Sequence, residues 1–210
     1  MFKLFGRPGW GSVLVEAQLA WYGLDYTVEE IEDPFASTEA RARLQAINPV
    51  AQVPALLLPD GEVMTESAAI TLHLADVAAS NSLVPAPGEP QRARFLRWLV
   101  FLVANIYPTF TFADDPSRFV PGEEAQTAFR ANVDAHAKRL WGIVDAHATA
   151  QPWFLEGRFS AIDIYVCTMT RWRPQRDWFA ANAPRLHRIA LAADELPQLK
   201  PVWEVNFPQA

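Results

Sequence analysis

The chain of 210 residues contains a single cysteine, Cys167. One thiol cannot form an intrachain disulfide, a CxxC redox pair or a thiolate-rich metal site. The four histidines also lack the spacing of a metal motif such as HExxH. We therefore expect no metal centre.

A basic excess and a long apolar run are missing as well. The formal net charge is −6, whereas a general nucleic-acid binder needs a basic surface to displace counterions. The longest uninterrupted apolar run, Trp98 to Ala104, is too short to span a bilayer. The first residues, MFKLFGRPGW, lack the apolar stretch of a secretory signal. We expect a cytoplasmic protein that binds neither nucleic acid nor membrane.

The composition is that of a globular protein, with half of the residues apolar and 12% aromatic. In the first third, strand-like and helix-like patterns alternate and end in a hairpin around Pro59-Asp60-Gly61. The order β-α-β-α-β-β-α predicts a small mixed sheet covered by helices. The expected elements are strands at 2–5, 26–31, 55–58 and 62–64 and helices at 12–22, 38–47 and 66–79.

Residues 80–89, SNSLVPAPGE, are rich in helix breakers and predict a linker. Every long segment after them has helical periodicity, with helices expected at 90–112, 122–149 and 161–172 and shorter ones after Pro174, Pro184 and Pro197. The fold class is thus an α/β domain at 1–79, followed after the linker by an all-α domain at 90–210.

The stretch VPALLLPDGEVMTESAAI, residues 53–70, raises a question of function. Pro54 can be cis, and its position leaves the backbone of Val53 to pair with an extended peptide. Glu66 and Ser67 open a helix, where free N–H groups favour an anion and a carboxylate can meet an ammonium group. A trans strand start and a plain capping pair explain the same residues without a ligand. Spacing alone leaves both readings open.

Two separated segments carry a family resemblance. INPVAQVPALLLPDGEVMTESAAITLHLAD resembles the glutathione-binding half of the cytosolic glutathione transferases. FLEGRFSAIDIYV resembles the helix-capping segment of their C-terminal domain, with Ser160 and Asp163 as the capping pair. The resemblance implies a thioredoxin-like N-terminal domain followed by an all-helical C-terminal domain.

The resemblance also implies how glutathione would be held. It predicts a cis peptide bond before Pro54 and pairing of the Val53 backbone with the cysteinyl unit. Ser67 would hold the γ-glutamyl carboxylate, Glu66 would approach the amino group, and Gln52 would assist with a carboxylate. A mild departure precedes these residues, because Ala51 stands where the family usually has glycine.

The group that activates the thiol is harder to find. The family lowers the thiol pKa with a Tyr, Ser or Cys near the first strand or helix, but those positions here hold Phe5, Gly6 and the residues 9–11, Gly-Trp-Gly. Ser12 is the remaining hydroxyl, and it can equally serve catalysis or cap the helix. A third reading combines Ser12 with the backbone N–H groups of that helix.

The implied activity is attack of the glutathione thiolate, with glutathione as co-substrate, on a hydrophobic electrophile, as in detoxification. Glutathione-dependent isomerisation or ether cleavage could use the same site, and the family implies a homodimer. The alternative is a non-catalytic glutathione-binding or regulatory protein with the same fold, favoured by the missing activating residue. The candidate residues for the hydrophobic substrate pocket are Trp10, Tyr107, Phe110, Trp172 and Trp178.

Overall fold

The computed structural model describes residues 1–208, which form two compact units. The first unit contains Met1–Val84 and also the C-terminal segment from Ala193, and the second contains Pro85–Ala192. The sequence had suggested a division within 80–89 and an all-helical domain that runs to the end of the chain. The structure instead assigns the C-terminal segment to the α/β unit.

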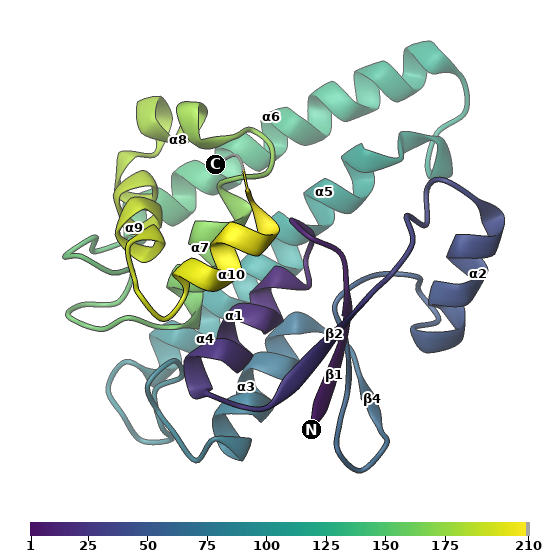
Figure 1. Cartoon of the computed structure of the whole chain (residues 1–210). Helices are drawn as coiled ribbons and strands as arrows, with labels where there is room; N and C mark the ends of the chain where they lie inside the picture. Colours follow the sequence, from purple (N-terminus) through teal and green to yellow (C-terminus); the bar gives the residue numbers. More distant parts are fainter. Residues whose placement is uncertain (209–210) are drawn as a thin grey trace. The chain divides into compact units, whose positions relative to one another are not determined.

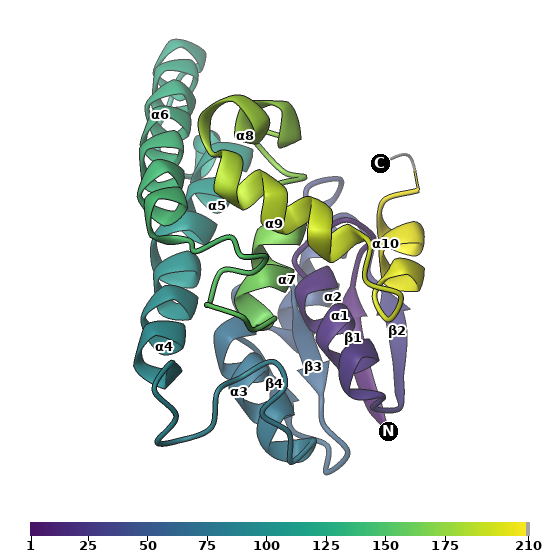
Figure 2. The same ribbon diagram turned by 90° about the vertical axis from the view of Figure 1, so that its left-hand side faces the viewer.

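A four-stranded sheet organises the first unit, with strand order β2-β1-β3-β4 (Figures 1 and 2). Strand β1 (Phe2–Gly6) pairs in parallel with β2 (Tyr26–Glu30) and antiparallel with β3 (Ala55–Leu57). Strand β3 pairs antiparallel with β4 (Val63–Met64). The helices of this unit are α1 (Val13–Tyr22), α2 (Thr38–Ile47), α3 (Ser67–Val77) and α10 (Lys200–Asn206).

Alternation along β1 supplies a hydrophobic core on each face of the sheet. Leu4 packs in a cluster with Val15 of α1 and Ile70 of α3. Its neighbour Phe5 points the other way and packs with Leu44 of α2. This arrangement is the thioredoxin-like fold that the sequence predicted.

The second unit is helical, as expected. Its elements are α4 (Arg92–Phe101), the π-helical turn η1 (Leu102–Ile106), α5 (Tyr107–Asp114), the 3-10 turn η2 (Pro116–Arg118), α6 (Glu123–His147), α7 (Ala161–Met169), α8 (Arg176–Asn182) and α9 (Pro184–Asp194).

Helices α4 and α5 form one continuous helix, Arg92–Asp114, interrupted by η1. Pro108 is the second residue after η1, and a proline has no N–H for the helical ladder, so the wider turn accommodates the interruption. By length and composition alone this helix could cross a membrane. In the structure it packs on α6 and α7.

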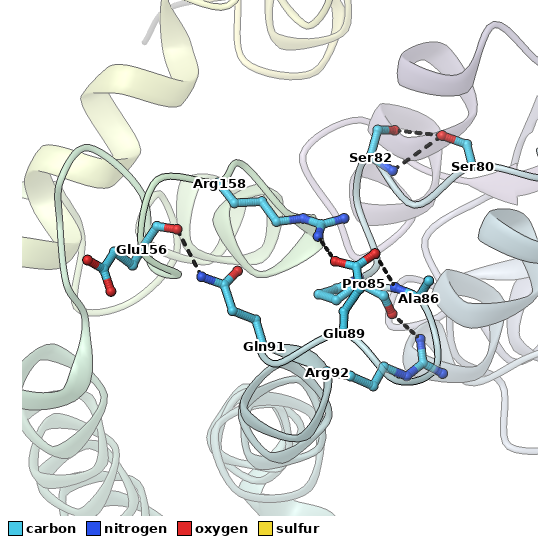
Figure 3. Close-up of polar contacts among 9 residues, drawn as sticks. All are labelled: Ser80, Ser82, Pro85, Ala86, Glu89, Gln91, Arg92, Glu156 and Arg158. Carbon is cyan, nitrogen blue, oxygen red and sulfur yellow. Dashed lines mark hydrogen bonds and ion pairs between the residues drawn. The ribbon is translucent and has the colours of Figure 1, made fainter.

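Polar contacts fasten the start of α4 to the loop before α7 (Figure 3). The Glu89 carboxylate accepts hydrogen bonds from the backbone N–H of Ala86 and from the Arg158 guanidinium. Gln91 donates to the carbonyl of Glu156 at 2.9 Å. These contacts hold the first turn of the long helix within its own unit.

The start of α7 carries the predicted capping pair. The N–H and the hydroxyl of Ser160 donate to one Asp163 oxygen at 2.8 and 2.9 Å, and the N–H of Phe154 donates to the other at 2.7 Å. Asp163 is fully buried, and burial raises its pKa to about 7, although the three donors lower it. The carboxyl is therefore a structural group with a pH-dependent contribution to stability.

We predict that Asp163 makes the protein less stable as the pH rises from about 4 to about 7. In that window the unfolded chain loses the Asp163 proton while the folded chain, with its raised pKa, retains it. The free energy of unfolding should therefore fall across the window and become independent of this group above it.

Urea unfolding at a series of pH values tests this prediction. Asp163→Asn should be less stable than the wild type by about 1–3 kcal/mol, because one donor loses its acceptor, and should lack this component of the slope. Asp177→Asn, on the exposed surface of α8, is the matched control. Equal slopes in the wild type and Asp163→Asn would contradict the prediction.

Candidate functional site

Three chain segments of the first unit meet at one end of the sheet. Pairing of Phe5 with Ala55 brings the end of β1 beside the residues that precede β3, Val53 and Pro54. Pairing of Leu56 with Met64 brings the residues that follow β4, Glu66 and Ser67, to the same end. The register thus gathers the residues that the sequence had selected for glutathione.

Asn48 shapes the loop that leads to β3. Its amide N–H donates to the carbonyl of Gln52 at 2.8 Å, and its side-chain oxygen accepts the N–H of Val50 at 3.2 Å. The loop contains Ala51 in the left-handed region, at φ 52°, and ends in a cis peptide bond between Val53 and Pro54. The cis bond was predicted, and the positive φ explains why glycine suits position 51.

The start of α3 leaves polar groups available to a ligand. Glu66 has φ 63° and makes no side-chain capping hydrogen bond, so the plain capping pair is not what the structure contains. The first helical hydrogen bond runs from Ile70 to the carbonyl of Glu66, and the N–H groups before it have no partner within the helix. The Ser67 hydroxyl also has no partner within residues 1–208. An exposed carboxylate and a helix N-terminus thus lie side by side.

The Ser12 side chain does not cap α1, although the sequence allowed that role. Its hydroxyl accepts the N–H of Arg7 at 3.1 Å and donates to the carbonyl of Arg7 at 3.2 Å, and it does not cap α1. Only 3% of the residue is exposed. A Cβ on Gly6 would lie 2.3 Å from this hydroxyl, so Gly6 leaves the space that Ser12 fills. Ser12 closes the loop of residues 7–12.

The N-terminus of α1 lies directly after this loop. The N–H of Val13 donates to Trp10, and that of Leu14 donates to Gly11. Within residues 1–208 the N–H groups of Gly11 and Ser12 have no acceptor. Together with the helix dipole they offer partial positive charge to an anion.

Trp10 packs against the cluster that contains Phe5 and Val53, on the α2 face of the sheet. Its ring lies 5.9 Å from that of Phe35 and 5.7 Å from the Arg7 guanidinium. The structure therefore places Trp10 beside the proposed glutathione residues of its own unit.

A residue from the far end of the chain joins the same loop. The side-chain oxygen of Asn206, in α10, accepts the N–H of Gly9 at 3.2 Å, and its amide nitrogen donates to Glu16 at 2.8 Å. Burial raises the pKa of Glu16, and the hydrogen bond from Asn206 lowers it. No periodicity or motif in the sequence indicated Asn206, because its partners are 190 and 197 residues away.

In the second unit, Tyr107, Phe110 and Trp172 form an aromatic trio, with edge-to-face ring centroids 5.0–6.3 Å apart. Trp178 packs instead on Phe179. Arg173, which follows Trp172, pairs with Asp114 at 2.9 Å and with Asp134 at 3.5 Å. A cavity of about 80 Å³ beside the trio is lined by Thr109, Phe110, Asp134, Ala137, Lys138, Arg173 and Pro174.

Comparison with known proteins identifies the family. The model of the glutathione S-transferase N-terminal domain matches residues 15–77. The uncharacterised GST-like protein YncG of Escherichia coli K12 is 38% identical over 206 residues, which cover 98% of each chain. The chain belongs to the glutathione S-transferase family.

Two further members of the family agree with this assignment. Glutathione S-transferase GstA of Escherichia coli O157:H7 is 30% identical over 81% of each chain. The structure of a sphingomonad glutathione S-transferase complexed with glutathione is 28% identical, with a TM-score of 0.78 over 99% of this chain and 100% of that one. The thioredoxin-like unit with its helical partner is thus the fold of a glutathione S-transferase.

The left-handed conformation of Ala51 leads to a stability prediction. Ala51→Gly should raise the free energy of unfolding by about 0.5–1 kcal/mol, because release of the strain outweighs the added chain entropy. Ala46→Gly, on the exposed surface of α2, should lower it by about 0.5–1 kcal/mol. Urea unfolding measures both variants, and a loss of stability in Ala51→Gly would disprove the strain.

Proposed function

We propose that the protein is a glutathione transferase that binds glutathione at the sheet end formed by Val53, Pro54, Glu66 and Ser67. The observation that carries this proposal is the convergence of these residues with the N-terminus of α1. The Val53 backbone pairs with the cysteinyl unit, in the manner of an added strand. Gln52, which is exposed beside Val53, assists with a carboxylate of the tripeptide.

The γ-glutamyl end of glutathione carries a carboxylate and an ammonium group, and the start of α3 can bind both. Its carboxylate receives the Ser67 hydroxyl and the first N–H groups of the helix. Its ammonium group approaches the Glu66 carboxylate. The positive φ of Glu66 turns the chain from β4 directly into α3, which keeps the carboxylate beside the helix N-terminus.

The thiol lies at the N-terminus of α1 in this arrangement. The N–H groups of Gly11 and Ser12, aided by the helix dipole, favour the thiolate, which is the nucleophile. The Ser12 hydroxyl contributes by holding the loop, since its hydrogen is directed to the carbonyl of Arg7. The thiolate then attacks a hydrophobic electrophile, and the leaving group departs with the displaced electron pair.

For the electrophile we propose the aromatic trio of Tyr107, Phe110 and Trp172 as the binding surface in the second unit. Trp10, in the loop of residues 7–12 of the first unit, is a separate candidate for contact with the electrophile. Trp178, whose ring packs on Phe179, is a further candidate for this surface. Isomerisation or ether cleavage with glutathione remains a second use of the same groups.

A cytoplasmic homodimer completes the proposal. Val50 in the first unit and Val100 on α4 are both more than half exposed, which leaves apolar surface for a second copy to cover. Light scattering of the purified protein measures this assembly.

A non-catalytic glutathione-binding protein is the second candidate. It is favoured by the engagement of the Ser12 hydroxyl within its own loop, which leaves the thiol without a side-chain donor at that position. Conjugation of chlorodinitrobenzene and of a panel of other electrophiles separates the two functions. Binding of glutathione without turnover on the whole panel would select the second.

Glutathione binding should depend on both residues at the start of α3. We expect Glu66→Gln to weaken the affinity by about tenfold and Ser67→Ala by about fivefold, the loss of a charged and of a neutral hydrogen bond. Glu62→Gln, exposed on the same hairpin, is the control for Glu66→Gln. Calorimetry gives the dissociation constants, and unchanged affinity in both site variants would sink this placement of the ligand.

Replacement of Ser12 should affect stability more than chemistry. Ser12→Ala removes both hydrogen bonds to Arg7 and should lower the free energy of unfolding by about 1–3 kcal/mol, with kcat reduced less than tenfold. Ser37→Ala, which removes the N-cap of α2, is a control for the stability loss. A large fall in kcat with a raised pKa of the bound thiol would show instead that the hydroxyl donates to sulfur.

A further inference from the structure

The C-terminal helix α10 ends against the loop that receives the glutathione sulfur in the proposed function. Asn206 is its last residue, and only 6% of it is exposed. Its side chain contacts Gly9 of the loop, Glu16 of α1 and the carbonyl of Val202 in its own helix. One buried amide therefore connects three segments of the first unit.

These three partners fix the orientation of the Asn206 amide. The N–H of Gly9 requires an acceptor, which the side-chain oxygen supplies at 3.2 Å. The Glu16 carboxylate and the Val202 carbonyl require a donor, which the nitrogen supplies at 2.8 and 2.9 Å. A flipped amide would turn its nitrogen toward the N–H of Gly9 and its oxygen toward two acceptors. The oxygen is thus committed to Gly9.

The backbone of Gly9 is shaped to this contact. Its φ of 77° lies in the region that favours glycine, and a Cβ there would stand 3.4 Å from the carbonyl oxygen of Asn206 and 3.6 Å from the Phe207 ring. Ser12 holds the loop at Arg7 and Asn206 holds it at Gly9, and the Arg7 side chain also donates to the carbonyl of Ile31 at 3.3 Å. Gly11 lies between Gly9 and the helix, so these contacts limit how its N–H can turn.

Glu16 couples this contact to α1. Its carboxylate is largely buried, and Asn206 is its one hydrogen-bond donor in the described part of the chain. Loss of Asn206 would leave a desolvated carboxylate without a donor, one turn into the helix whose N-terminus faces the thiol. Loop and helix therefore respond together to this single side chain.

Resting on the proposed function, we infer that Asn206 is a positioning residue for thiol activation: it holds the loop of residues 7–12 so that the N–H groups of Gly11 and Ser12 face the glutathione sulfur. It touches neither glutathione nor the electrophile in this role. Its effect passes through Gly9 and through Glu16. Asn206, in the last helix, thereby lowers the pKa of the bound glutathione thiol.

Two variants test this inference: Asn206→Ala, and the double variant that combines Asn206→Asp with Glu16→Gln. The double variant keeps an acceptor for Gly9 and restores a donor–acceptor pair with position 16, but the Val202 carbonyl loses its donor; Asn206→Asp alone also places two carboxylates together. Asn182→Ala is the matched control. Asn182 is also the last residue of its helix and donates to the carbonyl four residues earlier, but within residues 1–208 its side chain makes no hydrogen bond to a loop.

Two measurements on the full chain are needed. Hydrogen exchange of the amides at residues 9–12, in the free protein, reports whether the loop is held. The pH dependence of the thiolate absorbance of bound glutathione, with kcat/KM, reports thiol activation. We expect Asn206→Ala to speed the hydrogen exchange about tenfold, to raise the thiol pKa by about half a unit and to lower kcat/KM about threefold to tenfold. The double variant should recover part of each change, because the contacts with Gly9 and position 16 are kept while that with Val202 is lost.

The outcomes separate this inference from the proposed function. Wild type that does not bind glutathione in calorimetry refutes the proposed function and the positioning role with it, while hydrogen exchange still reports on the loop. Binding with unchanged exchange in Asn206→Ala refutes the inference alone. Faster exchange with an unchanged thiol pKa and kcat/KM, or losses that Asn182→Ala reproduces, reduces Asn206 to a stability contact and also overturns it.

Discussion

Antiparallel pairing of β3 with both β1 and β4 is the constraint on which the rest of the candidate site depends. Strand β3 has only three residues, but its register fixes which residues stand just beyond the ladder on either side. A slip of one residue would turn Leu56 out of the core and would separate Val53 from Glu66. The burial of Leu56 between α1 and α3 therefore protects the geometry at the end of the sheet.

At this end of the sheet, specific contacts hold residues in backbone conformations that they would not otherwise prefer. Ala51, Glu66 and Gly9 all have positive φ, and only one of them is glycine. Ala51 is held by its N–H to Asn48 at 2.7 Å, and Gly9 by Asn206. Residues in such conformations persist only where their surroundings determine them, and they gather at ligand sites. The pattern fits a loop system built to present backbone groups.

The features that could be predicted from the sequence depend on residues close together in the chain. The hairpin around Pro59-Asp60-Gly61, the capping pair at Ser160 and Asp163 and the start of α3 are short-range patterns, and each is present. The contacts that escaped prediction depend on residues without local signals. The role of Ser12 requires that Gly6 lack a Cβ, and Asn206 acts across nearly the whole chain.

The engagement of the Ser12 hydroxyl with Arg7 bears on the kind of electrophile that the proposed enzyme would accept. A helix N-terminus favours an anion by about 0.3–1 kcal/mol, which corresponds to less than about one pKa unit. A thiol with an ordinary pKa of about 8.5 would then remain largely protonated at neutral pH. Such a site gives a small thiolate fraction, so most of the reactivity has to reside in the second substrate. The proposed chemistry is therefore best matched to electrophiles that are already activated.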